Sequence, residues 1–234
     1  MRQWLKVSCT IHNDDSCKCG DPDQWPIATT LVTIAGSAGG LDGLRRILSA
    51  LPANLDAAVA AMLHAGAGSM LAQTLTRYSR LRVREVASGD FLRNGCVHVP
   101  RPCTHLVVNP DSRLSVSGAE AGLFRPSADW LFESAAASYR ERHVAVVLSG
   151  MLFDGSRQLR AVKKLGGTIL VQSPADAQYP DMPKAAIATR LVDRVVAIDG
   201  MAAAICEAVD RCRREHHVSV WEAPFDPGIK PAFS

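Results

Sequence analysis

The distribution of apolar and polar positions divides the chain into three parts. Residues 1–29 are polar, contain two prolines and show no regular spacing of apolar side chains. Over 30–217, short β-branched apolar runs alternate with segments in which apolar residues recur every three or four positions. We interpret 1–29 as a polar leader outside the core, 30–217 as one domain and 218–234 as an irregular tail.

The apolar runs of this domain predict strands, and its periodic segments predict helices. Strands are predicted at 30–35, 57–63, 143–149, 168–173 and 194–198, and helices at 41–51, 69–78, 127–141, 155–165, just after Pro183 and at 200–214. Strands that alternate with helices form parallel sheets covered on both sides. We therefore expect an α/β fold with a doubly wound, mostly parallel sheet and helices on both faces.

The middle of the domain has a different pattern. The segments LRVREVA, CVHVP, HLVVN and RLSVS alternate apolar and polar residues and are separated by turn residues such as Asn94-Gly95 and Asn109-Pro110. This pattern is typical of short strands joined by tight turns. We expect an antiparallel hairpin region at one edge of the sheet.

Composition narrows the classes of function. The net charge of +3 is small and the basic residues are dispersed, which does not indicate a nucleic-acid-binding protein. No apolar run approaches the ~20 residues that cross a bilayer, and the N-terminus lacks the features of a secretory signal. The sequence predicts a cytoplasmic protein without direct membrane insertion, and a monomer is the default expectation.

The chain has seven cysteines. Four stand singly in apolar or helical surroundings and are interpreted as buried, reduced thiols: Cys96, Cys103, Cys206 and Cys212. The other three lie in the leader beside one histidine: Cys9, His12, Cys17 and Cys19. A structural metal site normally has two C-x-x-C pairs, so this C-x-C favours a polar leader over a metal site. We expect no metal and no cofactor.

Three chemically useful side chains follow three predicted strands. Ser37 comes after strand 30–35, His64 after 57–63, and Asp154 shortly after 143–149. In open α/β sheets the ligand lies beyond the carboxyl ends of the strands, near the switch in strand order. A hydroxyl, an imidazole and a carboxylate are the parts of a serine-hydrolase triad. The pattern predicts Ser37 as nucleophile, His64 as base and Asp154 as the carboxylate that orients the base.

Each of these residues also has a structural interpretation. A serine in a glycine turn before a helix is often an N-cap, a lone histidine is often a surface residue, and the aspartate of FDG often occupies a turn or an N-cap. A dinucleotide-binding loop is a competing interpretation of the glycine turn. Its spacing is G-x-x-G-x-x-x-G, no acidic residue ends the second strand, and no Walker A Gly-Lys-Ser/Thr follows. The turn is not a G-x-S-x-G elbow either, because Ala35 stands at the first glycine.

The ordered motifs resemble the CheB-type chemotaxis protein-glutamate methylesterases in their catalytic domain, over about residues 30–199. The segments that carry the resemblance are IAGSAGG, LPANLDAAVAAMLHAGAG, GDFLRNGCVHVPRPCTHLVV, FRPSADWLFESAA, VVLSGMLFDGSRQL and VQSPADAQYPDMPKAAI. The resemblance implies the same Ser–His–Asp roles and the hydrolysis of glutamyl γ-methyl esters on the cytoplasmic helices of a methyl-accepting chemoreceptor, with release of methanol. Some relatives also deamidate glutamine. It places Met151 near the oxyanion, with Ala38 and Gly39 as supporting residues.

The chain departs from the family pattern at several positions. Ala38 replaces a threonine, Ala65 and Gly66 replace Met-Pro, and Leu152 and Phe153 replace a glycine and its neighbour. The leader is too short for the receiver domain that usually precedes this catalytic domain. These changes leave a second hypothesis open, namely a catalytically impaired binding or signalling module on the same fold.

Three further residues have open roles. Arg125 either binds an acidic receptor segment, pins a loop or is a surface charge. Ser127 is interpreted as the N-cap of helix 127–141. His105 is interpreted as a surface or structural residue rather than a catalytic one.

Overall fold

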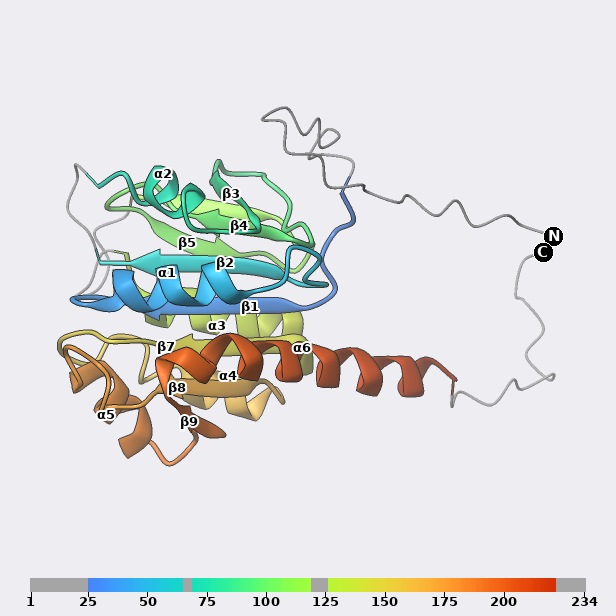
Figure 1. The fold of residues 1–234 in the computed structure, drawn as a ribbon. Helices are drawn as coiled ribbons and strands as arrows, with labels where there is room; N and C mark the ends of the chain where they lie inside the picture. Colours follow the sequence, from blue (N-terminus) through green and yellow to red (C-terminus); the bar gives the residue numbers. More distant parts are fainter. Residues whose placement is uncertain (1–24, 65–68, 119–125, 222–234) are drawn as a thin grey trace, which may run out of the picture.

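The computed structural model describes residues 25–64, 69–118 and 126–221 (Figure 1). Its main sheet has seven strands, all paired in parallel, in the order β3-β4-β2-β1-β7-β8-β9. They are β1 (Leu31–Gly36), β2 (Ala58–Leu63), β3 (Arg82–Glu85), β4 (Cys96–Val99), β7 (His143–Val147), β8 (Thr168–Gln172) and β9 (Arg194–Val196). A separate antiparallel pair consists of β5 (His105–Val108) and β6 (Leu114–Ser117).

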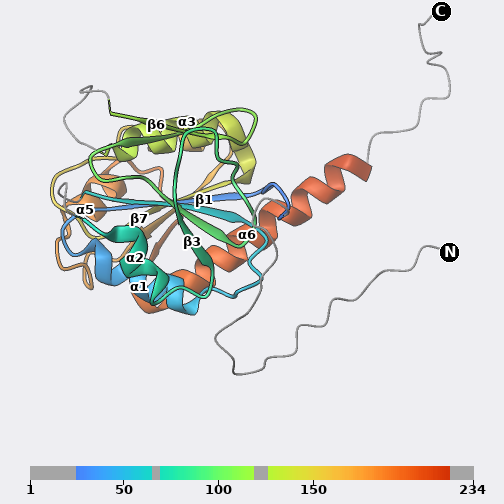
Figure 2. The ribbon, with the colours of Figure 1, turned by 90° about the horizontal axis from the view of Figure 1, so that it is seen from above.

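Helices cover both faces of the main sheet, as Figure 2 shows from above. They are α1 (Gly40–Ala50), α2 (Leu71–Thr76), α3 (Ala128–Tyr139), α4 (Leu159–Lys164), α5 (Asp181–Ala188) and α6 (Ile198–Trp221), with a 3₁₀ turn at Arg140–Arg142. The core on one face joins the sheet to α1, α2 and α6, and the core on the other joins it to α3, α4, α5 and the β5–β6 pair. The predicted doubly wound α/β fold is confirmed.

The strand order places a switch point in the middle of the sheet. The chain starts in β1, builds outward through β2 and β4, and then returns through α3 to β7 on the other side of β1. The connections after β1 and β7 therefore diverge on opposite faces at adjacent positions, which is where α/β folds leave a crevice for ligands. The carboxyl ends of β2, β1 and β7 all lie at the left edge of the sheet in Figure 1.

The alternation of side chains along β1 explains why the sheet is buried on both sides. Val32 and Ile34 pack against one layer of helices, whereas Leu31 and Ala35 pack against the other. All six residues of β1 are buried. A strand with two buried faces must be apolar at nearly every position, which is the continuous run that the sequence shows.

The middle of the chain is arranged differently from the prediction in one respect. The segments around Arg82–Glu85 and Cys96–Val99 were expected in a hairpin region, but they pair in parallel and extend the main sheet as β3 and β4. Only β5 and β6 form an antiparallel hairpin, and β5 packs on α3 rather than on the sheet edge. Alternating short strands look alike in either pairing, because the pattern records which face is buried and not which partner is bound.

Several boundaries also differ from the prediction. The leader is not wholly outside the core, since Ala28 is buried and its N–H donates to the Leu92 carbonyl at 2.9 Å. The last helix starts earlier and runs to Trp221, so that residues 218–221 of the expected tail are helical. The helix expected at 155–165 begins only at Leu159, and α5 already includes Pro183 in its first turn.

Two of the predicted buried thiols are partly exposed. Cys96 and Cys212 are buried as expected, but Cys103 and Cys206 are not fully covered. Cys103 lies in a turn with φ 58°, a conformation that the sequence pattern did not indicate. No helix in the described part of the chain is long and apolar enough to cross a membrane.

Two buried histidines predict a loss of stability in acid. Burial lowers the pKa of His143 from 6.5 to about 3, and burial together with the nearby Arg84 guanidinium lowers that of His98 to about 4. The unfolded chain binds protons at these sites near pH 6.5, whereas the folded protein does not. The resulting stability is complete above pH 6.5 and is lost as the pH falls toward 4, with a slope of up to about 1.4 kcal/mol per pH unit for each histidine.

The test is urea unfolding between pH 7.5 and 4.5 for the wild type and H98Q. The His98 ring nitrogen accepts the Arg93 N–H at 3.2 Å, and a glutamine oxygen can replace that acceptor without titrating. The variant is expected to lose roughly half of the acid dependence of the unfolding free energy. An unchanged slope would contradict a neutral His98 in the folded state.

Candidate active site

Ser37 lies in the tight turn between β1 and α1. Its N–H donates to the Ser149 carbonyl at 3.0 Å, and its own carbonyl accepts the Gly40 N–H at 2.9 Å. The N-cap of α1 is Gly39, in a left-handed conformation with φ 72°, so Ser37 is not the N-cap that one interpretation proposed. A methyl group at residue 39 would lie 2.7 Å from Ser149 Oγ, which explains why this position requires glycine.

His64 follows β2 at the same level of the sheet as Ser37. Gly36 and Leu63 are register partners, and the His64 N–H donates to the Gly36 carbonyl at 3.2 Å. Ser37 and His64 therefore each follow the last residue of one of two adjacent parallel strands. The imidazole Nε2 lies 2.8 Å from Asp154 Oδ2, and 17% of the side chain is exposed.

Asp154 is held by the start of α3. Its buried carboxylate accepts hydrogen bonds from Ser127 Oγ at 3.2 Å, from the Ala128 N–H at 2.6 Å and from the Asp129 N–H at 3.3 Å, in addition to the bond with His64. The first amides of a helix have no partner within the helix, and its N-terminus carries positive partial charge. These donors therefore favour negative charge on the buried Asp154 carboxylate.

Asp154 makes the hydrogen bonds expected from both interpretations of this residue. It caps a helix, as the structural alternative suggested, but the helix is α3, distant in sequence. It also binds His64, as the triad requires. Nε2 is the ring nitrogen of His64 that faces the carboxylate.

Ser127 binds this carboxylate directly, and His105 contacts Ser127 in turn. Ser127 occupies the N-cap position of α3 as predicted, but its hydroxyl makes no capping bond and binds Asp154 instead. The Ser127 N–H is 3.2 Å from Nδ1 of His105, whose ring is fully buried and stacks on Trp130 with centroids 4.3 Å apart. His105 is therefore structural, and the surface alternative for it is wrong.

Asp129 is a site-adjacent residue that the sequence analysis missed. Its Oδ1 accepts the Gln158 N–H at 3.2 Å, which links the start of α3 to the turn before α4. Burial, and then the neighbouring Asp154 carboxylate, raise the pKa of Asp129. The segment FRPSADWLFESAA contained this signal, because an aspartate two residues after the N-cap serine points to the same helix terminus.

A second missed residue, Ser149, braces the turn that contains Ser37. Its hydroxyl donates to the Ala38 carbonyl at 2.9 Å and accepts the Tyr179 N–H at 2.9 Å. Its backbone N–H donates to the Gln172 side chain at 2.8 Å. The turns after β1, β7 and β8 are thereby tied together around Ser37.

The loop after β7 passes directly against Ser37. A methyl group added at Gly150 would lie 2.9 Å from Ser37 Cβ, so no larger residue fits there. Met151 comes next in the chain and is 50% exposed. Leu152 has φ 66°, a left-handed conformation that is unfavourable for a leucine.

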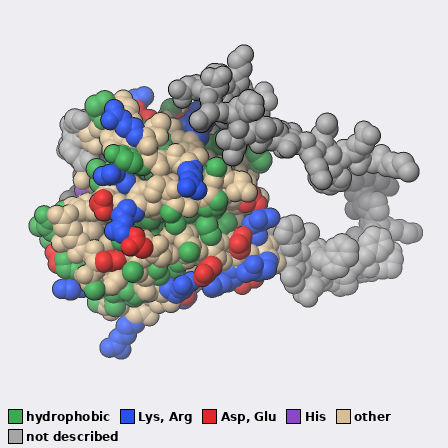
Figure 3. Space-filling model, viewed as in Figure 1, with side chains coloured by type: hydrophobic (Ala, Val, Ile, Leu, Met, Phe, Trp, Pro, Cys, Tyr) green, Lys and Arg blue, Asp and Glu red, His purple; other side chains and the backbone are tan. Residues whose placement is uncertain are grey.

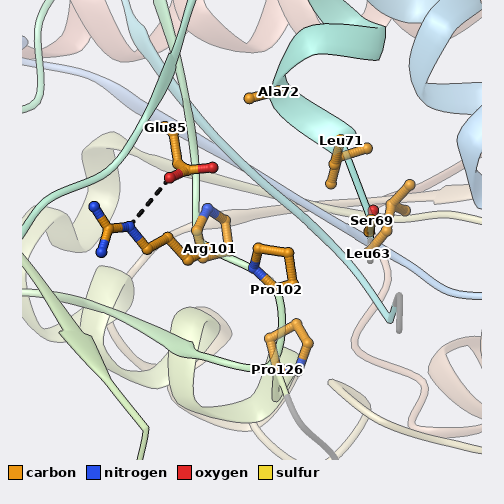
Figure 4. A pocket seen from close by; sticks show the side chains of 9 residues that line it. Leu63, Ser69, Leu71, Ala72, Glu85, Arg101, Pro102 and Pro126 are labelled. Carbon is orange, nitrogen blue, oxygen red and sulfur yellow. Dashed lines mark hydrogen bonds and ion pairs between the residues drawn. The ribbon is translucent and has the colours of Figure 1, made fainter. Parts of the chain in front are cut away.

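A small pocket lies at the carboxyl end of β2. Leu63 and Pro126, the residues immediately before His64 and Ser127, line it together with Leu71 and the 100–102 segment (Figure 4). Glu85 and Arg101 face each other across its rim with Nε and Oε1 3.1 Å apart. The pocket walls are otherwise largely apolar.

Several predicted residues lie outside the described part of the chain. Arg125 falls there, as do Ala65 and Gly66 after the histidine. The same holds for the leader cluster: Cys9, His12, Cys17 and Cys19. Over the described ranges, no group of three or more His, Cys, Asp or Glu side chains is placed to hold a metal ion.

Comparison with known proteins gives concordant results. A family model described as CheB methylesterase matches residues 32–205. A Moorella thermoacetica protein named protein-glutamate methylesterase/protein-glutamine glutaminase is 40% identical over 186 residues, covering 76% of this chain and 44% of that protein. A Rhizobium meliloti protein with the same name, encoded in its group 3 operon, is 34% identical over 221 residues, covering 92% of this chain and 60% of that protein.

The fold has a counterpart among solved structures. The crystal structure of the Thermotoga maritima CheB methylesterase catalytic domain superposes with a TM-score of 0.72 at 27% identity, over 76% of this chain and 97% of that domain. The chain spans about half the length of the two relatives named above.

Proposed function

Because this chain belongs to the CheB methylesterase family, we propose that it is a serine hydrolase that cleaves glutamyl γ-methyl esters with Ser37, His64 and Asp154. The single observation that carries the proposal is the His64–Asp154 hydrogen bond of 2.8 Å beside the Ser37 turn. The three groups come from adjacent strands β2, β1 and β7, at the switch point of the sheet. A triad is recognised by this kind of geometry and not by its order along the chain.

In the proposed reaction, Nε2 of His64 donates to Asp154 and Nδ1 is the basic nitrogen. Nδ1 of His64 accepts the Ser37 hydroxyl proton while Oγ attacks the ester carbonyl carbon, and Asp154 stabilises the imidazolium through Nε2. The tetrahedral intermediate collapses, and the methoxy group leaves as methanol with the proton from His64. Water, deprotonated by the same histidine, then hydrolyses the acyl-enzyme to a glutamate side chain and free Ser37.

Backbone amides supply the oxyanion stabilisation. Ala38 follows the nucleophile, and Met151 follows Gly150, which lies against Ser37. Within the described residues, neither the Ala38 N–H nor the Met151 N–H donates to another backbone group. Such pre-oriented donors stabilise a developing oxyanion without reorganisation. Gly39 supports them, because its left-handed turn lets α1 begin immediately behind Ala38.

The substrate assignment rests on the relatives. Their names specify methylated glutamate and, for deamidation, glutamine. The corresponding substrate for this chain is a methyl-accepting chemoreceptor or a similar signalling protein in the cytoplasm, with methanol or ammonia as the leaving product. No cofactor enters these steps.

The experiment measures methanol release from a chemoreceptor cytoplasmic fragment that carries deuterated glutamyl methyl esters. Catalytic release by the purified chain supports the proposal, and ammonia release from the unmethylated glutamine form tests the second activity. Receptor binding without either product would instead identify the protein as a binding module, the alternative that the substitutions at Leu152 and Phe153 left open.

A further inference from the structure

Large apolar side chains surround the entrance to the proposed site. Met151, Leu152 and Phe153 are 50%, 56% and 37% exposed, and Tyr179 is 37% exposed. The Tyr179 carbonyl accepts the Gly150 N–H at 2.9 Å, so both loops meet beside Ser37. Four large apolar residues gathered at one functional edge indicate a surface that another molecule covers.

The backbone of Leu152 adds an independent observation. It keeps a left-handed φ of 66° although glycine would adopt this conformation without strain. Its side chain points largely into solvent, so burial in the domain does not compensate for the strain. Strain of this kind is characteristic of functional segments, where the side chain is used in binding.

A basic surface continues from this apolar one. Arg157, Arg160 and Lys164 are exposed and line one groove along α4 and the turn before it. The Arg157 guanidinium lies 5.3 Å from the Phe153 ring centroid and joins the two surfaces. The segment 155–167 contains no aspartate or glutamate.

Several other exposed cations of the protein are paired with acidic side chains. The Arg46–Asp199 and Arg194–Glu207 ion pairs are examples. Figure 3 shows acidic and basic side chains interspersed on one face of the protein. On α4, Lys163 is paired with Asp193. None of the ion pairs found in the described structure involves Arg157, Arg160 or Lys164.

We propose that the apolar residues Met151–Phe153 and Tyr179, together with Arg157, Arg160 and Lys164, form a docking surface for an acidic amphipathic helix of the substrate protein. The proposal rests on the proposed function, because the docked helix is the one that carries the glutamyl ester. Its apolar positions contact the residues beside Ser37, and glutamates one or two turns along the helix reach the groove on α4. Charge complementarity then selects esters that are flanked by free glutamates.

The test compares two synthetic coiled-coil peptides. Both carry one glutamyl γ-methyl ester, and the residues three, four and seven positions away are glutamates in the acidic peptide and glutamines in the neutral one. The wild type is expected to show a kcat/KM about tenfold higher for the acidic peptide, a preference that 0.5 M NaCl removes. In the triple variant R157Q/R160Q/K164Q the preference is expected to disappear at low salt.

A matched control removes three exposed, unpaired cations at the opposite end of the sheet. The variant R77Q/R80Q/R211Q has the same net charge as the test variant and should retain the preference for the acidic peptide. An equal loss in both variants would show a general charge effect and overturn the proposal. A triple variant that keeps the preference but no longer binds phosphatidylserine vesicles would assign the basic surface to a membrane instead.

Failure of the proposed function gives a different result. If the wild type hydrolyses neither of the two peptides nor N-acetylglutamate γ-methyl ester, the proposed esterase function is wrong. Fluorescence anisotropy with labelled peptides then still decides the docking proposal. Tighter binding of the acidic peptide, lost in R157Q/R160Q/K164Q, supports it, and equal binding of the two peptides overturns it.

The apolar half of the surface is tested with L152G. Relief of the left-handed strain is expected to raise the melting temperature by about 2 °C. Loss of the side chain is expected to raise KM for the acidic peptide about fivefold, an effect of the size of one exposed apolar contact. The control is R190G, because Arg190 is also exposed with φ 59° and lies after α5, away from Ser37.

The two glycine variants separate strain from recognition. Both should melt at a higher temperature, but only L152G should bind the peptide more weakly. A raised melting temperature with unchanged KM in L152G would show that Leu152 contributes nothing to docking and would overturn the apolar part of the proposal.

Discussion

Replacing Ser37 with alanine is expected to lower kcat for methyl-ester hydrolysis by roughly 10⁴- to 10⁶-fold. In the proposed mechanism the Ser37 hydroxyl forms the acyl-enzyme, and the turn after β1 contains no other nucleophilic side chain. The residual rate should come from water activated by His64 and from the oxyanion amides of Ala38 and Met151. Methanol release and covalent labelling by a fluorophosphonate both measure the effect.

Stability should not explain this loss. Ser37 is only partly buried and makes hydrogen bonds through its backbone, so S37A should unfold within about 0.5 kcal/mol of the wild type. The matched control is S49A, on the exposed side of α1, which should retain both activity and labelling. Labelling of S37A at the wild-type rate would remove Ser37 from the mechanism.

Replacing Asp154 with asparagine is expected to impair both catalysis and folding. The side chain would keep one acceptor oxygen, but its amide would face either the His64 ring or the α3 amides, which also donate. The wrong histidine tautomer should lower kcat about 10⁴-fold. The unsatisfied helix terminus should cost about 2–4 kcal/mol of unfolding free energy.

Two measurements distinguish these effects. Urea unfolding gives the stability term, and turnover of the folded fraction at low temperature gives the catalytic term. The control is D42N. Asp42 also lies at a helix N-terminus, but it is exposed and contacts Arg45 and not His64, so stability and activity should both change little. A D154N protein that is less stable yet fully active would show that Asp154 serves only as the cap of α3.

The fold was largely predictable because burial on both sides leaves a clear signal. Strands such as 31–36 and 143–147 are continuous apolar runs, and their interpretation needs no knowledge of partners. The segments at 82–85 and 96–99 carry only the alternation of a strand. Whether they pair in parallel or antiparallel depends on partner strands that lie 14 and 38 positions away, so their place in the main sheet was not predictable.

The candidate catalytic side chains could be predicted from the sequence, but the hydrogen bonds that hold them in place could not. Ser37, His64 and Asp154 each follow an apolar run, and this position can be recognised in the linear sequence. The supporting contacts of Asp154 with Ser127 and the α3 amides join residues 25–27 positions apart. Nothing in the local pattern around FDG distinguishes a turn aspartate from one that caps another helix.

Local pattern alone therefore established which segments are strands and helices, that they form an α/β domain, and which hydroxyl, imidazole and carboxylate end its central strands. These conclusions depend on periodicity and on side-chain chemistry, which are properties of neighbouring residues. The tertiary structure decided that β2, β1 and β7 are adjacent, that Asp154 both caps α3 and binds His64, and that Arg157 lies over Phe153 at the entrance. Those features arise from strand order and from the meeting of helix termini, and they exist only after the chain has closed its core around the sheet.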